Sequence, residues 1–249
     1  MPVSNALIVL AHPDPQSFNA ALARASAQTL REAGAQVNIS DLYAMGFSAV
    51  AGRGDMNDAP VEGPFNLATE QGRAFEAGTL AADIRAEQEK VAAADLVIFQ
   101  FPIWWYSMPA IMKGWIDRVL TYKFAYGLGQ WWDAGPFRDK RAMLSITTGT
   151  PRGAYACDGR NGDIERILWP LEAGILGICG FQVMPSFLAY GAPWIGDEGR
   201  KAQIRALQAQ LTGIDSLEPR FFHKLAEYGE DLRLRPDVKP ATPGQHRPG

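Results

Sequence analysis

Short apolar runs alternate along this chain with stretches of helical spacing. Apolar runs predict strands at 6–11, 96–101, 142–146 and 181–188, and a more mixed run predicts another at 36–40. Uninterrupted apolar runs of this length are typical of strands covered on both faces. Helical spacing predicts helices at 17–33, 83–93, 164–178 and 197–211, and one more behind Pro109.

Local signals place the ends of several predicted helices. Ser17 is a suitable N-cap, and Gly34 is a suitable stop for the first helix. Behind Pro109 one helical face carries the apolar residues Met108, Met112, Trp115, Ile116, Val119 and Leu120, and Lys113 can pair with Asp117 on the other face. We expect Pro170 to kink the helix over 164–178. Residues 41–67 are rich in Gly, Pro and Asn and predict a long loop.

Strands that alternate with helices predict an α/β fold. The expected architecture is a doubly wound, parallel, five-stranded sheet with helices on both faces. We expect one domain over residues 1–235. Residues 236–249 carry four prolines and few apolar residues, which predicts a disordered tail.

Composition narrows the function classes. The 249 residues carry a formal net charge of −3, which argues against nucleic acid and against an anionic membrane surface as partners. No apolar run approaches the roughly 20 residues of a membrane span. The chain has two cysteines and three scattered histidines, so we expect neither disulfides nor a metal site. The N-terminal residues lack the pattern of a signal peptide, and we expect a cytoplasmic protein.

Candidate chemistry lies where three predicted strands end, because ligands of doubly wound sheets bind beyond the carboxyl ends of the strands. After the first strand, the segment His12–Asn19 places an imidazole, a hydroxyl and an amide at a helix N-terminus, a combination that favours a phosphate. A simple capped turn explains the same pattern equally well. The segment lacks both the Rossmann glycine spacing and the P-loop lysine.

Two further strand ends complete the pattern. After the third strand, Pro102, Ile103, Trp104, Trp105 and Tyr106 can form an apolar wall for a planar ligand, or they can pack as core. After the fourth strand, the segment 147–155 combines small residues with Arg152 and Tyr155 as donors. A phosphate site, an aromatic wall and a donor-rich loop around one crevice together indicate a flavin nucleotide pocket.

The motifs ALIVLAH, SFN, SDLYAM, AADLVIFQFP, PAIMKGW, FAYG, GPFR, LSITTG and ILWPLEAGILGICGFQV give the chain a strong family resemblance. Over roughly residues 6–200 it resembles the NAD(P)H:quinone oxidoreductases of the DT-diaphorase and modulator-of-drug-activity type. The resemblance implies a flavodoxin-like fold with strand order 2-1-3-4-5 and a homodimer with active sites at the subunit interface. It also implies bound FAD and two-electron reduction of quinones by NAD(P)H.

The resemblance also assigns roles to individual residues. It implies that His12, Ser17, Phe18, Asn19 and Asn66 face the FAD phosphates, that Arg200 lies near the adenosine, and that Pro102, Ile103, Trp104, Trp105 and Tyr106 line the flavin. It implies that Thr147, Thr148, Gly149 and Thr150 bond the ring edge with Tyr155 beside a flavin carbonyl. Trp105, Tyr106, Leu128, Asn161 and the partner subunit's Tyr126 are expected around the substrate.

Three positions depart from the family pattern. Asn161 stands where the family has the histidine that pairs with the loop tyrosine, Thr150 stands for the second glycine of the TTGG loop, and Leu128 stands for a cavity tyrosine. Asn161 cannot become a cation near neutral pH. We therefore expect Arg152 or the Gly149 and Thr150 amides to stabilise the negative charge of the reduced ring, with Tyr155, Asn161 and Arg152 as catalytic candidates. As a surface loop charge, Arg152 would have no such role.

Alternative functions remain open at this point. An FMN-dependent reductase of azo compounds, nitro compounds or quinones would use the same fold. A flavin-bearing regulatory subunit of a transporter would bind the cofactor without turnover, and a flavodoxin-type carrier would pass single electrons. Such carriers are usually strongly acidic and shorter, unlike this chain.

Overall fold

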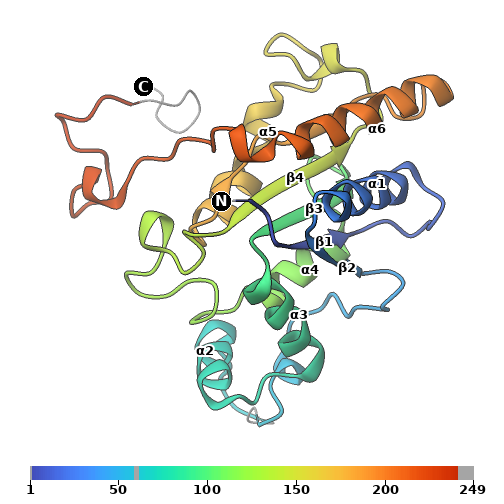
Figure 1. Cartoon of the computed structure of the whole chain (residues 1–249). Helices are drawn as coiled ribbons and strands as arrows, with labels where there is room; N and C mark the ends of the chain where they lie inside the picture. The colour runs from blue at the N-terminus through green and yellow to red at the C-terminus, as the bar shows by residue number, and fades with distance from the viewer. Residues whose placement is uncertain (1, 59–61, 241–249) are drawn as a thin grey trace.

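The computed structural model describes residues 2–58 and 62–240 and has a parallel sheet at its centre (Figure 1). The strand order is β2-β1-β3-β4-β5, and β6 also pairs with β4. The strands are β1 (Asn5–Leu10), β2 (Gln36–Asp41), β3 (Leu96–Pro102), β4 (Arg141–Thr147), β5 (Gln182–Val183) and β6 (Phe187–Ala189). This order confirms the expected doubly wound, flavodoxin-like architecture.

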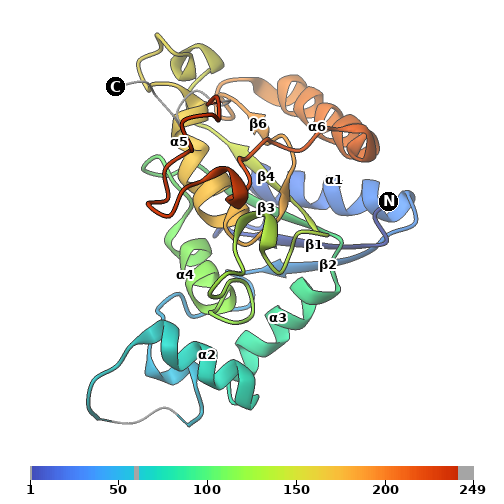
Figure 2. The same cartoon turned by 90° about the vertical axis from the view of Figure 1, so that its left-hand side faces the viewer.

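Helices cover both faces of the sheet (Figure 2). They are α1 (Phe18–Glu32), α2 (Leu67–Ala77), α3 (Ala82–Ala93), α4 (Ala110–Val119), α5 (Ile164–Leu171) and α6 (Gly196–Thr212). One hydrophobic cluster joins α1 and α6 to one face, and another joins α3, α4 and α5 to the opposite face. Short 3₁₀ turns lie at Arg53–Asp55, Trp132–Ala134, Arg152–Tyr155, Ile214–Ser216 and Leu225–Glu227.

The register brings the carboxyl ends of the central strands to one edge. Leu10 of β1 lies beside Gln100 of β3, and Pro102 of β3 lies beside Thr147 of β4. All of β3 is buried, as its unbroken apolar run predicts. The segments that follow β1, β3 and β4 therefore emerge side by side.

The predicted helix signals are confirmed. Ser17 caps α1, and its Oγ accepts from the Ala20 amide at 3.1 Å. Gly34 follows α1 with a left-handed φ of +93°. On α4, Trp115 is fully buried, and Lys113 lies 2.6 Å from Asp117 on the exposed side.

The structure adds detail to the sequence prediction at three places. The strand expected over 181–188 is two strands, because Pro185 has no N–H for the ladder and the chain leaves β4 between β5 and β6. The helix expected over 164–178 is α-helical only to Leu171 and continues as a π-helical turn over Glu172–Gly177, directly after Pro170. The helix α2 was not foreseen; Asn66 caps its start, and Gly78 ends it with a φ of +70°.

The predicted C-terminal tail lies mostly outside the described residues. Residues 236–240 are described and are largely exposed, whereas 241–249 are not described. Within residues 2–58 and 62–240, none of the helices has both the length and the apolar character needed to cross a membrane.

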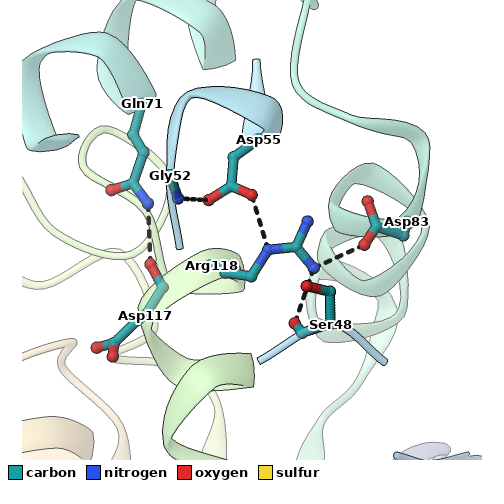
Figure 3. A network of polar contacts seen from close by, with 7 residues as sticks. All are labelled: Ser48, Gly52, Asp55, Gln71, Asp83, Asp117 and Arg118. Carbon is teal, nitrogen blue, oxygen red and sulfur yellow. Dashed lines mark hydrogen bonds and ion pairs between the residues drawn. The ribbon is translucent and has the colours of Figure 1, made fainter. Parts of the chain in front are cut away.

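A buried ion-pair network fastens the long loop after β2 to α4 (Figure 3). Arg118 Nε lies 2.8 Å from Asp55, and its Nη1 lies 2.7 Å from Asp83 and 3.1 Å from the Ser48 carbonyl oxygen. The second Asp55 oxygen accepts from the Gly52 amide at 3.1 Å. Arg118 and Asp55 are almost fully buried, and every charge in this cluster faces a partner.

Candidate active site

A large cavity opens at the carboxyl edge of the sheet, with a volume of about 810 Å³. This size suits a nucleotide-sized ligand. Its walls come from the ends of β1, β3 and β4, from the start of α1 and from α6. The residues that the sequence predicted for a cofactor and that line this cavity are His12, Ser17, Phe18, Asn19, Pro102, Ile103, Trp104, Thr147, Thr148, Gly149 and Arg200.

The start of α1 presents hydrogen-bond donors to the cavity. Ser17 satisfies the Ala20 amide, while the amides of Phe18 and Asn19 have no acceptor among the described residues. Unpaired amides at a helix N-terminus, together with the helix dipole, favour an anion such as phosphate. Arg200 and Lys201 add positive charge to the same cavity.

His12 is held in one orientation beside this helix end. Its Nδ1 lies 3.0 Å from the Asp14 amide nitrogen and 3.3 Å from the Asp14 carbonyl oxygen; in the tautomer whose Nδ1 accepts from the amide, Nε2 carries the proton. Its ring centroid lies 6.2 Å from that of Trp104. His12 thus links the helix end to the aromatic side of the cavity and offers a further N–H donor.

Buried amide groups fix the floor of the cavity. Gln100 Nε2 donates to Asn19 Oδ1 at 2.9 Å, and Asn19 Nδ2 donates to the Thr147 hydroxyl at 2.9 Å. These bonds join β3, α1 and β4 at the point where the strand order reverses. The Asn19 side chain is engaged in these bonds, so its backbone amide is the group left for the expected phosphate contact.

The aromatic segment after β3 forms a tight turn. Trp104 and Ser107 exchange backbone hydrogen bonds, and the two residues between them, Trp105 and Tyr106, have left-handed φ values of +50° and +60°. Left-handed backbone at bulky residues costs of the order of 1–3 kcal/mol each and is concentrated at functional sites. The turn directs Trp104 into the cavity wall and leaves Trp105 97% exposed.

The loop after β4 brings two of the three family departures, Thr150 and Asn161, together. Asn161 Nδ2 donates to the Thr150 hydroxyl at 2.9 Å, so two of the substituted residues bond to each other. Tyr155 is buried, and its ring centroid lies 5.8 Å from that of Tyr190. Arg152 is exposed and has no ion-pair partner among the described residues. Burial raises the pKa of Tyr190, which the nearby Arg152 charge partly opposes.

Several predicted site residues lie outside the walls of this cavity in the single chain. These are Asn66, Trp105, Tyr106, Tyr126, Leu128, Thr150, Arg152, Tyr155 and Asn161. Asn66 caps α2, where its Oδ1 accepts from the Thr69 amide, and Leu128 is largely exposed. Tyr126 lines a second cavity of about 440 Å³ between α2, α4 and the π-helical turn.

The sequence reading missed one wall of the main cavity. Gln16, Ala21, Ala192, Pro193, Asp197, Lys201 and Ile204 also line it. Most of them follow β6 or lie on α6. The rule that ligands bind at strand ends applies to the fifth strand as well, and applying it there would have found the segment 190–197. Arg200 donates to the Ala192 carbonyl oxygen and pairs with Asp197 at 2.6 Å, which lowers the pKa of Asp197.

The residues fit a flavin nucleotide. One part of the cavity has the unpaired amides of Phe18 and Asn19 for phosphate, and another has the Trp104 ring for a planar group. A Cβ added at Gly149 would meet no atom within 4 Å, so the backbone here faces open space and a flat ring edge can approach it closely. No group of three or more His, Cys, Asp or Glu residues able to hold a metal occurs in the described part of the chain.

Comparison with known proteins agrees with this geometry. Residues 4–224 match a family model described as a flavodoxin-like fold. The rat protein named NAD(P)H dehydrogenase [quinone] 1 is 42% identical over 89% of this chain and 81% of its own length. The mouse ribosyldihydronicotinamide dehydrogenase [quinone] is also 42% identical, over 86% of this chain and 93% of its own.

A solved structure extends the likeness to three dimensions. A candidate quinone reductase from Klebsiella pneumoniae superposes with a TM-score of 0.92 and 40% identity, covering 97% of both chains. Fold, sequence and cavity therefore agree. The chain belongs to the flavodoxin-like family, among the NAD(P)H:quinone oxidoreductases of the DT-diaphorase type.

Proposed function

We propose that this protein is a flavin-dependent NAD(P)H:quinone oxidoreductase that binds FAD in the main cavity and reduces quinones by two electrons. The observation that carries this proposal is the pairing, in one cavity, of an unpaired helix N-terminus with an aromatic wall and the open backbone at Gly149. When bound, the flavin would supply the chemistry of hydride transfer between the nicotinamide and the quinone.

The helix end of the cavity would hold the pyrophosphate. The amides of Phe18 and Asn19 and the Nε2–H of His12 can donate to phosphate oxygens, and Ser17 keeps the first turn of α1 in place. Arg200 and Lys201 lie on the α6 side, where they suit the adenosine end of FAD. Because FMN has no adenosine, Arg200→Ala should weaken FAD binding and leave FMN binding nearly unchanged.

The β3 side of the cavity would hold the ring. Trp104 offers a flat apolar surface, and Gly149 offers backbone donors at the ring edge. Donors at this edge stabilise negative charge that develops there during hydride uptake. Arg152 and Tyr155 lie on the loop that continues from these donors, and we assign them to charge stabilisation.

Asn161 has a different role from the histidine that the family has at this position. Its amide is engaged with the Thr150 hydroxyl, so we assign it to holding the loop rather than to proton transfer. A side chain that cannot ionise adds no titration of its own near neutral pH. The pH profile of flavin reduction should therefore be unchanged by Asn161→Leu, even if the rate falls.

We further propose that two copies of the chain complete each site. Trp105 and Leu128 are large apolar side chains that are largely exposed in the single chain, and a subunit interface would cover them. In this arrangement Tyr126 of one copy would close the other copy's cavity. Sedimentation velocity should give a dimer mass, and Trp105→Asp should shift it toward the monomer.

The domain, the compartment and the hydride donor belong to the same proposal. We place the flavin-binding domain over residues 1–235. Cys157 and Cys179 are both unpaired thiols, which suits a reducing cytoplasm. The names of the two curated relatives differ in the hydride donor, so NADH, NADPH and dihydronicotinamide riboside should be tested in parallel.

One assay panel tests the proposal. The three donors are measured against several simple quinones, and the mass of the extracted flavin is determined. We expect turnover with parallel-line kinetics, as in a ping-pong reaction, and the mass of FAD. The mass of FMN would instead favour the smaller cofactor. Flavin binding without turnover would favour a regulatory subunit, and one-electron acceptors reduced in preference to quinones would favour a carrier.

A further inference from the structure

The three consecutive carbonyl groups of Thr148, Gly149 and Thr150 all accept hydrogen bonds from the segment that follows β6. The Thr148 carbonyl oxygen accepts from the Ala192 amide at 2.9 Å, and that of Thr150 accepts from the Gly191 amide at 2.9 Å. The Gly149 carbonyl oxygen accepts from the indole Nε1 of Trp194 at 2.9 Å. All three acceptors thus bond to the segment that follows β6.

Because trans peptides are planar, the direction of these carbonyl groups also fixes the direction of the neighbouring N–H groups. In a trans peptide the N–H points opposite to the C=O of the same unit. The N–H groups of Gly149 and Thr150 therefore point away from the segment after β6, toward the β3 side that carries Trp104. Neither N–H has an acceptor among the described residues, and Pro151 contributes no third donor. Successive N–H groups of this kind form a site for negative charge.

The hydrogen bond from Trp194 differs in kind from the other two hydrogen bonds. The Gly191 and Ala192 bonds come from the backbone, whereas the Gly149 bond comes from a side chain. The Trp194 side chain is 80% exposed, so it contributes little buried apolar surface, and its defined polar contact is the bond to Gly149. Trp194 does not line the cavity itself. It holds the peptide between Gly149 and Thr150 from outside.

We propose that Trp194 is a positioning residue that keeps the Gly149–Thr150 peptide turned so that its N–H faces the bound flavin. This inference rests on the proposed function. A fixed donor stabilises the negatively charged reduced ring more than the neutral oxidised ring, because hydrogen bonds to charged groups are the stronger ones. Trp194 therefore raises the reduction potential of the flavin without touching it.

The test compares Trp194→Phe, which keeps a ring but removes the N–H, with Trp169→Phe as a matched control. Trp169 packs on Phe222 and lies outside the cavity wall. The dissociation constants of oxidised and reduced FAD and the midpoint potential are measured for both variants. We expect Trp194→Phe to weaken the reduced form three- to tenfold more than the oxidised form, which lowers the potential by about 15–30 mV for a two-electron couple. Trp169→Phe should change neither.

A second measurement needs no flavin. In ¹⁵N-tryptophan-labelled protein, the indole N–H signal that disappears in Trp194→Phe should exchange with solvent more slowly than that of N-acetyltryptophanamide. Exchange as fast as that of N-acetyltryptophanamide would contradict the hydrogen bond between Trp194 and Gly149. Equal weakening of both redox forms, or no change in potential, would overturn the positioning role while leaving the proposed function intact. Failure of the wild-type protein to bind flavin would instead refute the proposed function.

Discussion

The cavity at the carboxyl edge of the sheet and the Arg118 network on α4 both gather polar groups, but the chain uses these groups in opposite ways. In the network, Arg118, Asp55 and Asp83 face one another, and backbone groups complete the set. In the cavity, the amides of Phe18, Asn19, Gly149 and Thr150 have no acceptor among the described residues. Polar groups that pair with one another within the chain stabilise the fold, whereas unpaired donors in a cavity are available to bind a ligand.

Breaking the network should produce the largest effect on stability. Arg118→Met leaves Asp55 buried without its counter-charge, and removal of one member of a buried pair costs about 3–5 kcal/mol. Urea denaturation should show this loss in the free energy of unfolding, while the flavin affinity of the folded protein stays nearly the same. A large loss of affinity with unchanged stability would mean that the network serves the cavity directly.

Removing the Trp104 ring should have the opposite effect, with a small loss of stability and a larger loss of flavin affinity. Trp104 is 41% exposed, so Trp104→Ala should cost less than about 1 kcal/mol of stability. Loss of the stacking surface should weaken flavin binding about tenfold, since aromatic contacts contribute about 0.5–1.5 kcal/mol beyond burial. Titration followed by flavin fluorescence measures the affinity. Unchanged affinity would show that the ring lies elsewhere.

The Asn161–Thr150 bond should give a smaller, paired effect. Asn161→Ala, Thr150→Val and the double variant form a mutant cycle. A single neutral hydrogen bond predicts a coupling energy of about 0.5–1.5 kcal/mol in the free energy of unfolding. Purely additive effects would separate the two substitutions and contradict the joint role that the structure assigns to them.

The smallest effect is expected on the outer side of α4. Lys113 and Asp117 lie 2.6 Å apart but are about half exposed, and solvent-exposed pairs contribute at most about 0.5 kcal/mol in a helix. Lys113→Met should therefore change the unfolding free energy by less than this amount. It is the matched control for Arg118→Met because both positions lie on one helix. An effect as large as that of Arg118→Met would invalidate the contrast between buried and exposed charge.

Local patterns in the sequence predicted most of the fold. The apolar runs at 6–11 and 96–101 and the cap at Ser17 are properties of neighbouring residues, and the structure confirms them. The interruption of the fifth strand at Pro185 was harder to predict, because the apolar run over 181–188 favours one strand while the missing N–H of proline disfavours it. The Asp55–Arg118 pair joins positions 63 residues apart, and no local pattern indicates it.

The candidate site was predictable to the extent that it follows strand ends. His12, Trp104 and Gly149 each come directly after a predicted strand, and the structure brings them to one cavity. The hydrogen bond from Trp194 to Gly149 depends on the path of the segment after β6. Because the sequence predicted one strand over 181–188, it did not indicate that path. Tyr126 and Leu128 lie outside this cavity in the single chain, and the role expected of Tyr126 depends on the proposed second copy.

A crystal structure of the protein grown with FAD tests the central claim most directly. We predict a flavin in the main cavity, with its phosphates on the Phe18 and Asn19 amides, its ring against Trp104, and the Gly149 and Thr150 amides within hydrogen-bond distance of the ring edge. A flavin bound elsewhere, or an empty cavity at saturating FAD, would contradict the account.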